Sequence, residues 1–147
     1  MFAVNVGMLM LANFCNSRLV SRFGPQRMLN LGLVLALVSA TLLCLANWFE
    51  LDLVFTVLSI APLMASLGLI ATNADAMILM RFPEHSGTAT AVIGTLRFGS
   101  GALAGPLLAL AYTGTALPFS VLMLCGVVAI AVSQFFGVYQ AKSVEAN

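Results

Sequence analysis

Polar residues divide the chain into five long apolar stretches. These stretches cover about residues 1–17, 28–49, 53–80, 87–112 and 117–139. A helix needs about 20 mostly apolar residues, within a range of about 17–25, to cross the hydrocarbon core of a bilayer. The last four stretches meet that length, and the first is marginal. The pattern therefore predicts an all-α membrane protein with five transmembrane helices.

Four short breaks separate the stretches, and most of them are marked by charge. In chain order, the residues that mark the breaks and the C-terminal tail are Arg18, Arg22 and Arg27, then Glu50 and Asp52, then Arg81, Glu84 and His85, then Thr113, Gly114, Thr115 and Pro118, and finally Lys142 and Glu145. The fourth break is uncharged, but Gly and Pro beside Thr are typical of a turn. Transmembrane strands are disfavoured because they alternate apolar and polar residues, whereas residues 31–46 and 121–132 are apolar on every side.

The composition agrees with a membrane protein. Of the 147 residues, 61% are hydrophobic and 7% are charged, against roughly 25% charged residues in an ordinary soluble domain. Six Lys or Arg and five Asp or Glu residues cannot form the surface of a soluble enzyme or the basic patch of a nucleic-acid-binding domain. Both classes are therefore excluded.

The basic residues also predict an orientation. Five of the six Lys and Arg residues lie in the first break, the third break and the C-terminal tail, and the N-terminus and the other two breaks have none. Because cytoplasmic loops carry the excess of Lys and Arg, that side is expected to face the cytoplasm. Trp48, Phe49 and Tyr112 lie where interfacial aromatic residues belong. We expect the N-terminus outside and the C-terminus in the cytoplasm.

Three polar residues inside the apolar stretches are candidates for lining a substrate cavity. Arg97 lies about ten residues beyond Gly87, or about 15 Å deep at about 1.5 Å per residue. An ionisable residue at that depth is costly and marks a cavity, a pathway or a paired charge. Asp75 either joins Arg97 or is an interfacial acid paired with Arg81 or His85. Asn73 either lines the cavity or hydrogen-bonds between helices, and Arg97 itself has a structural alternative, bonded to backbone carbonyls.

Other chemistry is not indicated by the sequence. It contains no Ser/His/Asp cluster, no paired carboxylates and no phosphate-binding loop, so we expect neither an enzyme nor a cofactor. The three cysteines, Cys15, Cys44 and Cys125, lack the spacing of a disulfide framework or metal site. We expect them to be buried free thiols that pack as small hydrophobic residues.

The first break resembles the loop signature of the major facilitator superfamily, a Gly-x-Leu-x-Asp-Arg-x-Gly-Arg pattern. In that superfamily the pattern links the second and third helices and recurs, degraded, between the eighth and ninth. Ser17, Ser21 and Pro25 replace the first Gly, the acidic residue and a basic residue, as in the degraded copy. The residues assigned to this cytoplasmic loop motif are Leu19, Arg22, Gly24 and Arg27.

The fourth apolar stretch contains small residues at helical spacing. Close backbone approach at small residues is what drives helix packing in lipid, so we expect this stripe to pack against another helix. Its end, Gly-x-x-x-Gly-Pro, resembles the fifth-helix signature of superfamily antiporters, whose counterpart in the second half is the eleventh helix. The residues assigned to this helix-packing motif are Gly94, Gly101, Gly105 and Pro106.

Several further matches narrow the resemblance. The segments Asn16–Pro25, Asn73-Ala74, Arg81-Phe82-Pro83, Gly87–Ala91 and Phe98–Ala102 resemble the bicyclomycin- and chloramphenicol-resistance type of drug:proton antiporter. The resemblance implies that residues 1–147 are helices eight to twelve, a partial C-terminal half-domain of a twelve-helix protein in the bacterial inner membrane. It further implies multidrug efflux of small amphipathic compounds by proton antiport and alternating access, with the missing N-terminal half as partner.

Two alternatives come from other classes of protein. A small homo-oligomeric membrane transporter would have about four spans and an acidic residue in its first helix, and residues 1–17 contain no acid. A structural subunit of a membrane complex would have no need of a buried charge, so Arg97 argues against it.

Overall fold

The described part of the chain folds into five long α-helices and one short 3-10 helix. The computed structural model describes the backbone of residues 2–111 and 114–145, and the side chains within residues 6–52, 54–111 and 114–137. In chain order the elements are α1 (Phe2–Phe23), α2 (Pro25–Trp48), α3 (Leu53–Arg81), the 3-10 helix η1 (Pro83–His85), α4 (Ser86–Leu110) and α5 (Leu117–Glu145). The described residues contain no strand, which confirms the predicted all-α class.

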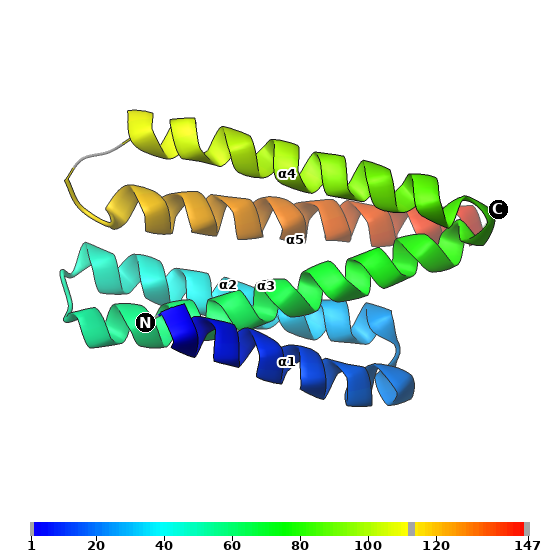
Figure 1. The fold of residues 1–147 in the computed structure, drawn as a ribbon, viewed down its shortest axis with the longest axis horizontal. Helices are drawn as coiled ribbons and strands as arrows, with labels where there is room; N and C mark the ends of the chain where they lie inside the picture. The colour runs from blue at the N-terminus through cyan, green and yellow to red at the C-terminus, as the bar shows by residue number, and fades with distance from the viewer. Residues whose placement is uncertain (1, 112–113, 146–147) are drawn as a thin grey trace.

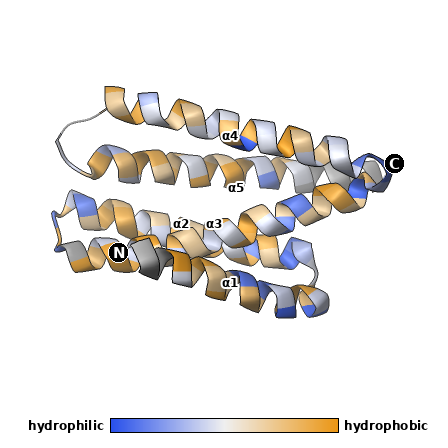
Figure 2. Cartoon of the chain, viewed as in Figure 1, coloured by the Kyte–Doolittle hydropathy of each residue, from blue (hydrophilic) through white to orange (hydrophobic). Residues whose placement is uncertain are grey.

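Among the described residues, four helices are long and apolar enough to cross a membrane. They are α2, α3, α4 and α5, with the span of α4 counted from Pro83 and that of α5 ending at Gly137. Figure 2 shows that hydrophilic positions gather mostly toward the ends of the bundle. The protein is therefore a multi-pass membrane protein. The described part of α1 does not meet the same criterion, because Asn13, Asn16, Arg18 and Arg22 lie in it, so a crossing by α1 stays a prediction.

The first connection is much shorter than the sequence pattern indicates. The apolar stretches predict helices that end near residue 17 and resume near residue 28, but α1 continues to Phe23 and α2 begins at Pro25. Gly24 alone makes the turn with φ 78°, a backbone conformation that glycine adopts without steric cost. Pro25 follows at the first position of α2, where its missing N–H is not needed. The arginines of this region consequently lie on helical turns and not in a loop.

The connection from α2 to α3 is also tight. Glu50 has φ 50°, and the backbone N–H of Leu51 donates to the carbonyl oxygen of Ala46 at 2.9 Å. A residue in the left-handed conformation followed by such a bond closes a helix C-terminus in a Schellman motif. The charged break predicted at Glu50 and Asp52 is therefore a helix end. The predicted features at Met1, Tyr112 and Thr113 lie outside the described residues.

The core of the bundle lies between α2, α3 and α5. Its buried members are Ala36, Ala40 and Leu43 of α2, Leu63 and Ile70 of α3, and Val127 of α5. Alanines on α2 let α3 approach closely, and α3 packs most extensively against α2 and next against α1. A Cβ at Gly32 of α2 would lie 3.3 Å or less from Ile70, Leu69 and the carbonyl oxygen of Ser66. Gly32 is therefore required by the close α2–α3 contact.

Helix α4 lies at the edge of the bundle. It contains no buried residue, and its contacts with α3 and α5 are sparse compared with those of α3 with α1 and α2. Figure 1 shows α4 along one side of the bundle and α1 along the opposite side, with the other helices between them. The ends of α3 and α4 are joined through η1. This arrangement places Asp75 of α3 and Arg97 of α4 on a face that the chain itself does not cover.

Candidate functional site

Arg97 of α4 and Asp75 of α3 form an ion pair. The Nη2 atom of Arg97 donates to Oδ1 of Asp75 at 2.8 Å and to Oδ2 at 3.0 Å. The Arg97 side chain is 51% exposed and the Asp75 side chain 30% exposed. The pair therefore lies on the open side of the α3–α4 junction and not in the core.

The pair forms although the two residues differ in depth along their helices. Measured from the shared connection, Arg97 lies eleven residues beyond Ser86 and Asp75 six residues before Arg81, or about 16 Å and about 9 Å at about 1.5 Å per residue. Helical side chains lean toward the N-terminus of their helix. The long Arg97 side chain therefore extends back toward the connection, where Asp75 lies.

Pairing lowers the cost of placing these charges within membrane-spanning helices. An unpaired Arg at the centre of a transmembrane helix costs about 2.5 to 3.5 kcal/mol on insertion scales. Asp75 accepts hydrogen bonds from Arg97, so of the pairings that the sequence left open, the one with Arg97 is formed. Backbone carbonyls as the alternative partners of Arg97 are not observed among its described hydrogen bonds.

A small cavity lies beside the ion pair. Its volume is about 150 Å³, and it is lined by Asp75 and Leu79 of α3 and by Thr90, Ile93, Gly94 and Arg97 of α4. The Thr90 hydroxyl donates to the carbonyl oxygen of Ser86 in its own helix at 2.8 Å. The polar groups free to meet a bound molecule are therefore those of Arg97 and Asp75.

Asn73 lies away from this cavity, in the interface between α1 and α3. It is 1% exposed, and its Nδ2 atom donates to the Asn16 side-chain oxygen at 2.9 Å and to the Leu69 carbonyl oxygen at 2.7 Å. Nδ2 of Asn16 in turn contacts the Thr72 hydroxyl at 3.4 Å. Of the two interpretations left open for Asn73, the geometry favours hydrogen bonding between helices.

The sequence interpretation missed the α1 side of this polar cluster. Asn13 and Asn16 are three residues apart, which places them on one face of α1. The Asn13 side-chain oxygen is buried and has no hydrogen-bond partner among the described residues. The two asparagines at helical spacing in a marginal apolar stretch could have indicated this cluster. An amide inside a membrane-spanning helix needs a partner on a neighbouring helix.

The loop-motif residues surround the turn at Gly24. Leu19, Arg22 and Arg27 are exposed, and Gly24 is half-buried. The nearby Arg18 guanidinium lies over the Phe14 ring, with its Cζ atom 5.6 Å from the ring centroid. The arginines thus gather at one end of the bundle, around the α1–α2 connection.

The helix-packing motif has no packing partner within the described chain. A Cβ added at Gly94, Gly101 or Gly105 would meet nothing within 4 Å, and Pro106 lies inside α4 without ending the helix. The expected packing of this stripe against another helix is therefore absent among the described residues. The stripe is left on the open face of α4, on the same helix as Arg97.

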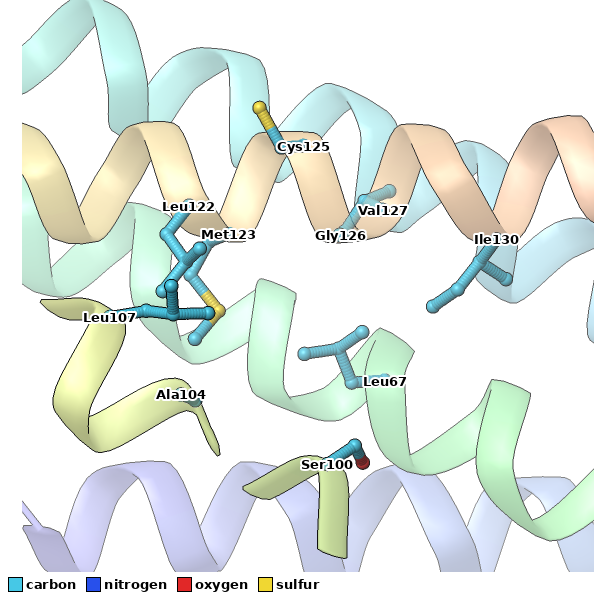
Figure 3. Close-up of a pocket in the computed structure, with 10 residues that line it drawn as sticks. All are labelled: Leu67, Ser100, Ala104, Leu107, Leu122, Met123, Cys125, Gly126, Val127 and Ile130. Carbon is cyan, nitrogen blue, oxygen red and sulfur yellow. The ribbon is translucent and has the colours of Figure 1, made fainter. Parts of the chain in front are cut away.

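An apolar groove lies between α3, α4 and α5, and Figure 3 shows the side chains around it. Its volume is about 350 Å³. The residues that line it are Leu67 of α3, Ser100, Ala104 and Leu107 of α4, and Leu122, Met123, Cys125, Gly126, Val127 and Ile130 of α5. It marks the place where α4 stands apart from α5.

The cysteines differ from the expected buried thiols. All three are free, but Cys15 and Cys125 are exposed and Cys44 is half-buried. The expectation of burial was wrong because the outer faces of these helices are apolar and are not covered by the chain itself. Cysteine on such a face packs as a small hydrophobic residue against whatever surrounds the helix.

One curated protein is similar to almost the whole chain. The chain is 32% identical over 135 residues to the bicyclomycin resistance protein homolog of Haemophilus influenzae, and the match covers 92% of this chain. It covers 34% of the relative, so the chain spans about a third of the length of that protein. No family model and no solved structure matches the chain.

The match agrees with the predicted resemblance over almost the whole chain. A chain of apolar helices that aligns over 92% of its length with a third of a larger protein corresponds to a segment of such a protein. The predicted resemblance to the bicyclomycin-resistance type of the major facilitator superfamily is thereby confirmed.

Proposed function

We propose that the chain is part of a multidrug efflux transporter that exports small amphipathic compounds by proton antiport and alternating access. The observation that carries the proposal is the 32% identity, over 92% of the chain, to a bicyclomycin resistance protein homolog. Transporters of this superfamily consist of two six-helix halves, with the substrate site near the bilayer midplane and rocking of the halves around it. Five helices correspond to most of one half.

In this proposal the chain lies in the bacterial inner membrane with its N-terminus outside and its C-terminus in the cytoplasm. Support comes from Arg18, Arg22 and Arg27, which lie around the α1–α2 connection, and from Arg81 at the end of α3. Loops rich in Lys and Arg face the cytoplasm. The connections after α2 and α4 then face outward.

The open face of α3 and α4 would face the remainder of the transporter. Arg97 and Asp75 present a paired charge there, and the stripe with Gly94, Gly101 and Gly105 lies uncovered on the same helix. Ionisable residues within transmembrane segments face the bundle interior or a water-filled cavity. We propose that Arg97 and Asp75 line the substrate cavity and orient substrate, that no cofactor or metal takes part, and that the chain has no enzymatic activity.

The test is a chimera in which this chain replaces the matching segment of the Haemophilus influenzae relative. In a drug-sensitive bacterium, the chimera should raise resistance to bicyclomycin above that of the vector, and a proton uncoupler should abolish the drug efflux. The relative without the segment serves as the negative control. Equal expression without resistance or efflux would contradict the proposal.

Expression of the chain by itself distinguishes this proposal from the alternative of a small homo-oligomeric transporter. Without a second half, no cavity can close on both sides of the membrane, so the chain alone should confer no resistance. Resistance from the 147 residues by themselves would favour a small homo-oligomeric transporter.

A further inference from the structure

Two arginines beside the turn at Gly24 have no acidic partner among the described residues. Arg22 lies in the last turn of α1 and Arg27 in the first turn of α2, and both are exposed. The described ion pair is that of Arg97 with Asp75, and no described group accepts a hydrogen bond from Arg22 or Arg27. The positive end of the α2 dipole also disfavours a cation at Arg27. A negative group from outside the described chain would therefore stabilise this end of the bundle.

These arginines lie at one surface of the membrane. Helix α2 is long and apolar enough to span it and begins at Pro25, so the residues that flank the turn lie at the level of the lipid headgroups. The Arg18 guanidinium, one helical turn before Arg22, lies over the Phe14 ring and adds a third positive charge. Residues 14–31 contain no acid, so the ammonium group of a zwitterionic headgroup would meet like charges without a counter-charge. The surface therefore favours a headgroup with a net negative charge.

An exposed apolar stripe continues from Arg27 along α2. Its members follow Arg27 at steps of three or four residues, which places them on one face of the helix. Each is between 47% and 54% exposed. The residues of this α2 stripe are Leu31, Leu35, Val38, Leu42 and Leu45. Because ionisable residues of membrane proteins face the interior of the bundle, a wholly apolar stripe on a spanning helix is a surface for lipid chains.

An apolar groove lies on the α2 stripe, near the middle of the bilayer. Its volume is about 300 Å³, and it is lined by Leu37, Val38, Thr41 and Leu42. The Thr41 hydroxyl donates to the carbonyl oxygen of Leu37 at 2.7 Å, so its hydrogen is already bound within the helix. Val38 lies eleven residues beyond Arg27, or about 16 Å at about 1.5 Å per residue. That distance is about half of the roughly 30 Å hydrocarbon core, so an acyl chain with its headgroup at Arg27 reaches this groove.

We propose that the α1–α2 connection and the α2 stripe bind one anionic phospholipid. Its phosphate contacts Arg22 and Arg27, and one acyl chain lies along the stripe as far as the groove at Val38. Arginine suits this contact because its planar group donates two parallel hydrogen bonds to phosphate oxygens. A phosphate shared by both arginines links the ends of α1 and α2, two helices that contact each other sparsely. The inference goes beyond the proposed function and does not depend on which compound is exported.

The test places a fluorescent reporter at the groove. Trp48 is the single tryptophan of the chain, so the full chain with Trp48→Phe and Val38→Trp has its tryptophan fluorescence at the groove. The purified chain is reconstituted in mixtures of phosphatidylcholine and phosphatidylglycerol with the same acyl chains, one of the two lipids being brominated. Bromine quenches tryptophan on contact, so quenching reports which lipid lies at the groove. We expect phosphatidylglycerol to bind there at least five-fold more strongly than phosphatidylcholine.

Two further reporters show whether the preference is local. Leu31→Trp, on the same stripe, should report the same preference as Val38→Trp. Val128→Trp is the matched control, because Val128 is exposed on α5, a helix without arginine, and it should report nearly equal binding of the two lipids. An equal preference at Val128→Trp would mean that the chain attracts anionic lipid everywhere and would overturn the site. Absence of a preference at both Leu31→Trp and Val38→Trp would also overturn it.

Substitution of the arginines tests the contact itself. In the Val38→Trp chain, Arg27→Gln or Arg22→Gln should lower the preference for phosphatidylglycerol about five-fold, which corresponds to about 1 kcal/mol per basic residue near an anionic surface. Arg27→Lys keeps the charge and should retain most of the preference. Arg81→Gln removes the same charge at the end of α3 and should leave the preference unchanged. A loss in Arg81→Gln or in Arg27→Lys as great as that in Arg27→Gln would contradict a phosphate contact at Arg27.

Glycerol phosphate distinguishes a lipid from a soluble phosphate as the occupant. It carries the same phosphate but lacks the acyl chain that contacts the α2 stripe, so at millimolar concentration it should leave the preference for phosphatidylglycerol unchanged. Loss of the preference would assign the arginines to a soluble anion and would overturn the lipid site. The measurement uses neither drug nor transport. Its failure is therefore distinguishable from a failure of the chimera to export drug.

Discussion

The side-chain amide of Asn73 joins α3 to α1 through a hydrogen bond of 2.9 Å to the side-chain oxygen of Asn16. Both residues are buried, with 1% and 8% of their surfaces exposed. In lipid, helices gain little from the hydrophobic effect when they associate, and packing and polar contacts fix their pairing. This bond therefore sets the register between α1 and α3.

We predict that Asn73→Leu destabilises the α1–α3 pairing by about 1 kcal/mol, since interhelical hydrogen bonds in membranes average about 0.6 and reach about 1.7 kcal/mol. The substitution also leaves the buried Asn16 oxygen without its donor. The loss is measured as a decrease in the free energy of unfolding, obtained by titrating the detergent-solubilised chain with a denaturing detergent. Asn30→Leu is the matched control, because Asn30 is exposed and its described side-chain bond is to Gln26 of the same helix. A loss of equal size in both variants would contradict a specific role for Asn73.

A second prediction compares a glycine in a close helix contact, Gly32, with a glycine on an open helix face, Gly101. Gly32→Val should destabilise the chain by about 1–3 kcal/mol, the usual cost of overpacking, because even a Cβ there approaches α3 at 3.1 to 3.3 Å. Gly101→Val is the matched substitution on the open face of α4, where nothing lies within 4 Å, and should change the stability of the isolated chain little. The same denaturation series measures both. A greater loss in Gly101→Val than in Gly32→Val would show that α4 packs differently from the structure.

A third prediction concerns topology. After replacement of the native cysteines, single cysteines at Asp52 and Gly114 should react with a membrane-impermeant thiol reagent added outside the cell. Cysteines at Ser21 and His85 should react only after the membrane is permeabilised. The expectation follows from the concentration of basic residues in the first and third breaks and the tendency of such loops to stay in the cytoplasm. Labelling of Ser21→Cys in intact cells would show that the orientation is the reverse of the predicted one.

The number and order of the helices could be predicted because lipid imposes a simple rule on the sequence. A spanning segment must satisfy its backbone internally and present apolar side chains, so charged breaks at Glu50 and Arg81 marked the helix ends well. The first connection was predicted less well. Arg18 and Arg22 interrupt the apolar pattern without interrupting the helix, which ends only at Phe23 because Gly24 takes a positive φ.

The site could be predicted in part for a different reason. The cost of an unpaired charge in a membrane pointed to both Arg97 and Asp75, and their distances from a shared connection made a contact possible. Asn73 contacts Asn16 and does not line the cavity, and this placement depends on which faces of α1 and α3 meet. Helix packing determines that geometry, and a single sequence without a clear hydrophobic face does not reveal it.

The last prediction concerns Arg97 in the chimera with the Haemophilus influenzae relative. Arg97→Gln keeps hydrogen-bond donors on the open face of α4, so expression and insertion should be nearly unchanged, while drug export should fall or its substrate profile should change. Arg97→Leu should be more damaging, because it leaves Asp75 charged and without the partner that it has now.

The double variant Asp75→Asn with Arg97→Gln separates structure from function. It removes both charges together, so insertion should return to the level of the unmodified chimera. Export should stay low if the pair orients substrate, and should recover if the pair only holds α3 to α4. The comparison uses the minimum inhibitory concentrations of two chemically different drugs, measured at equal membrane expression of the variants. Unmodified resistance in Arg97→Gln and in the double variant would make Arg97 a purely structural residue.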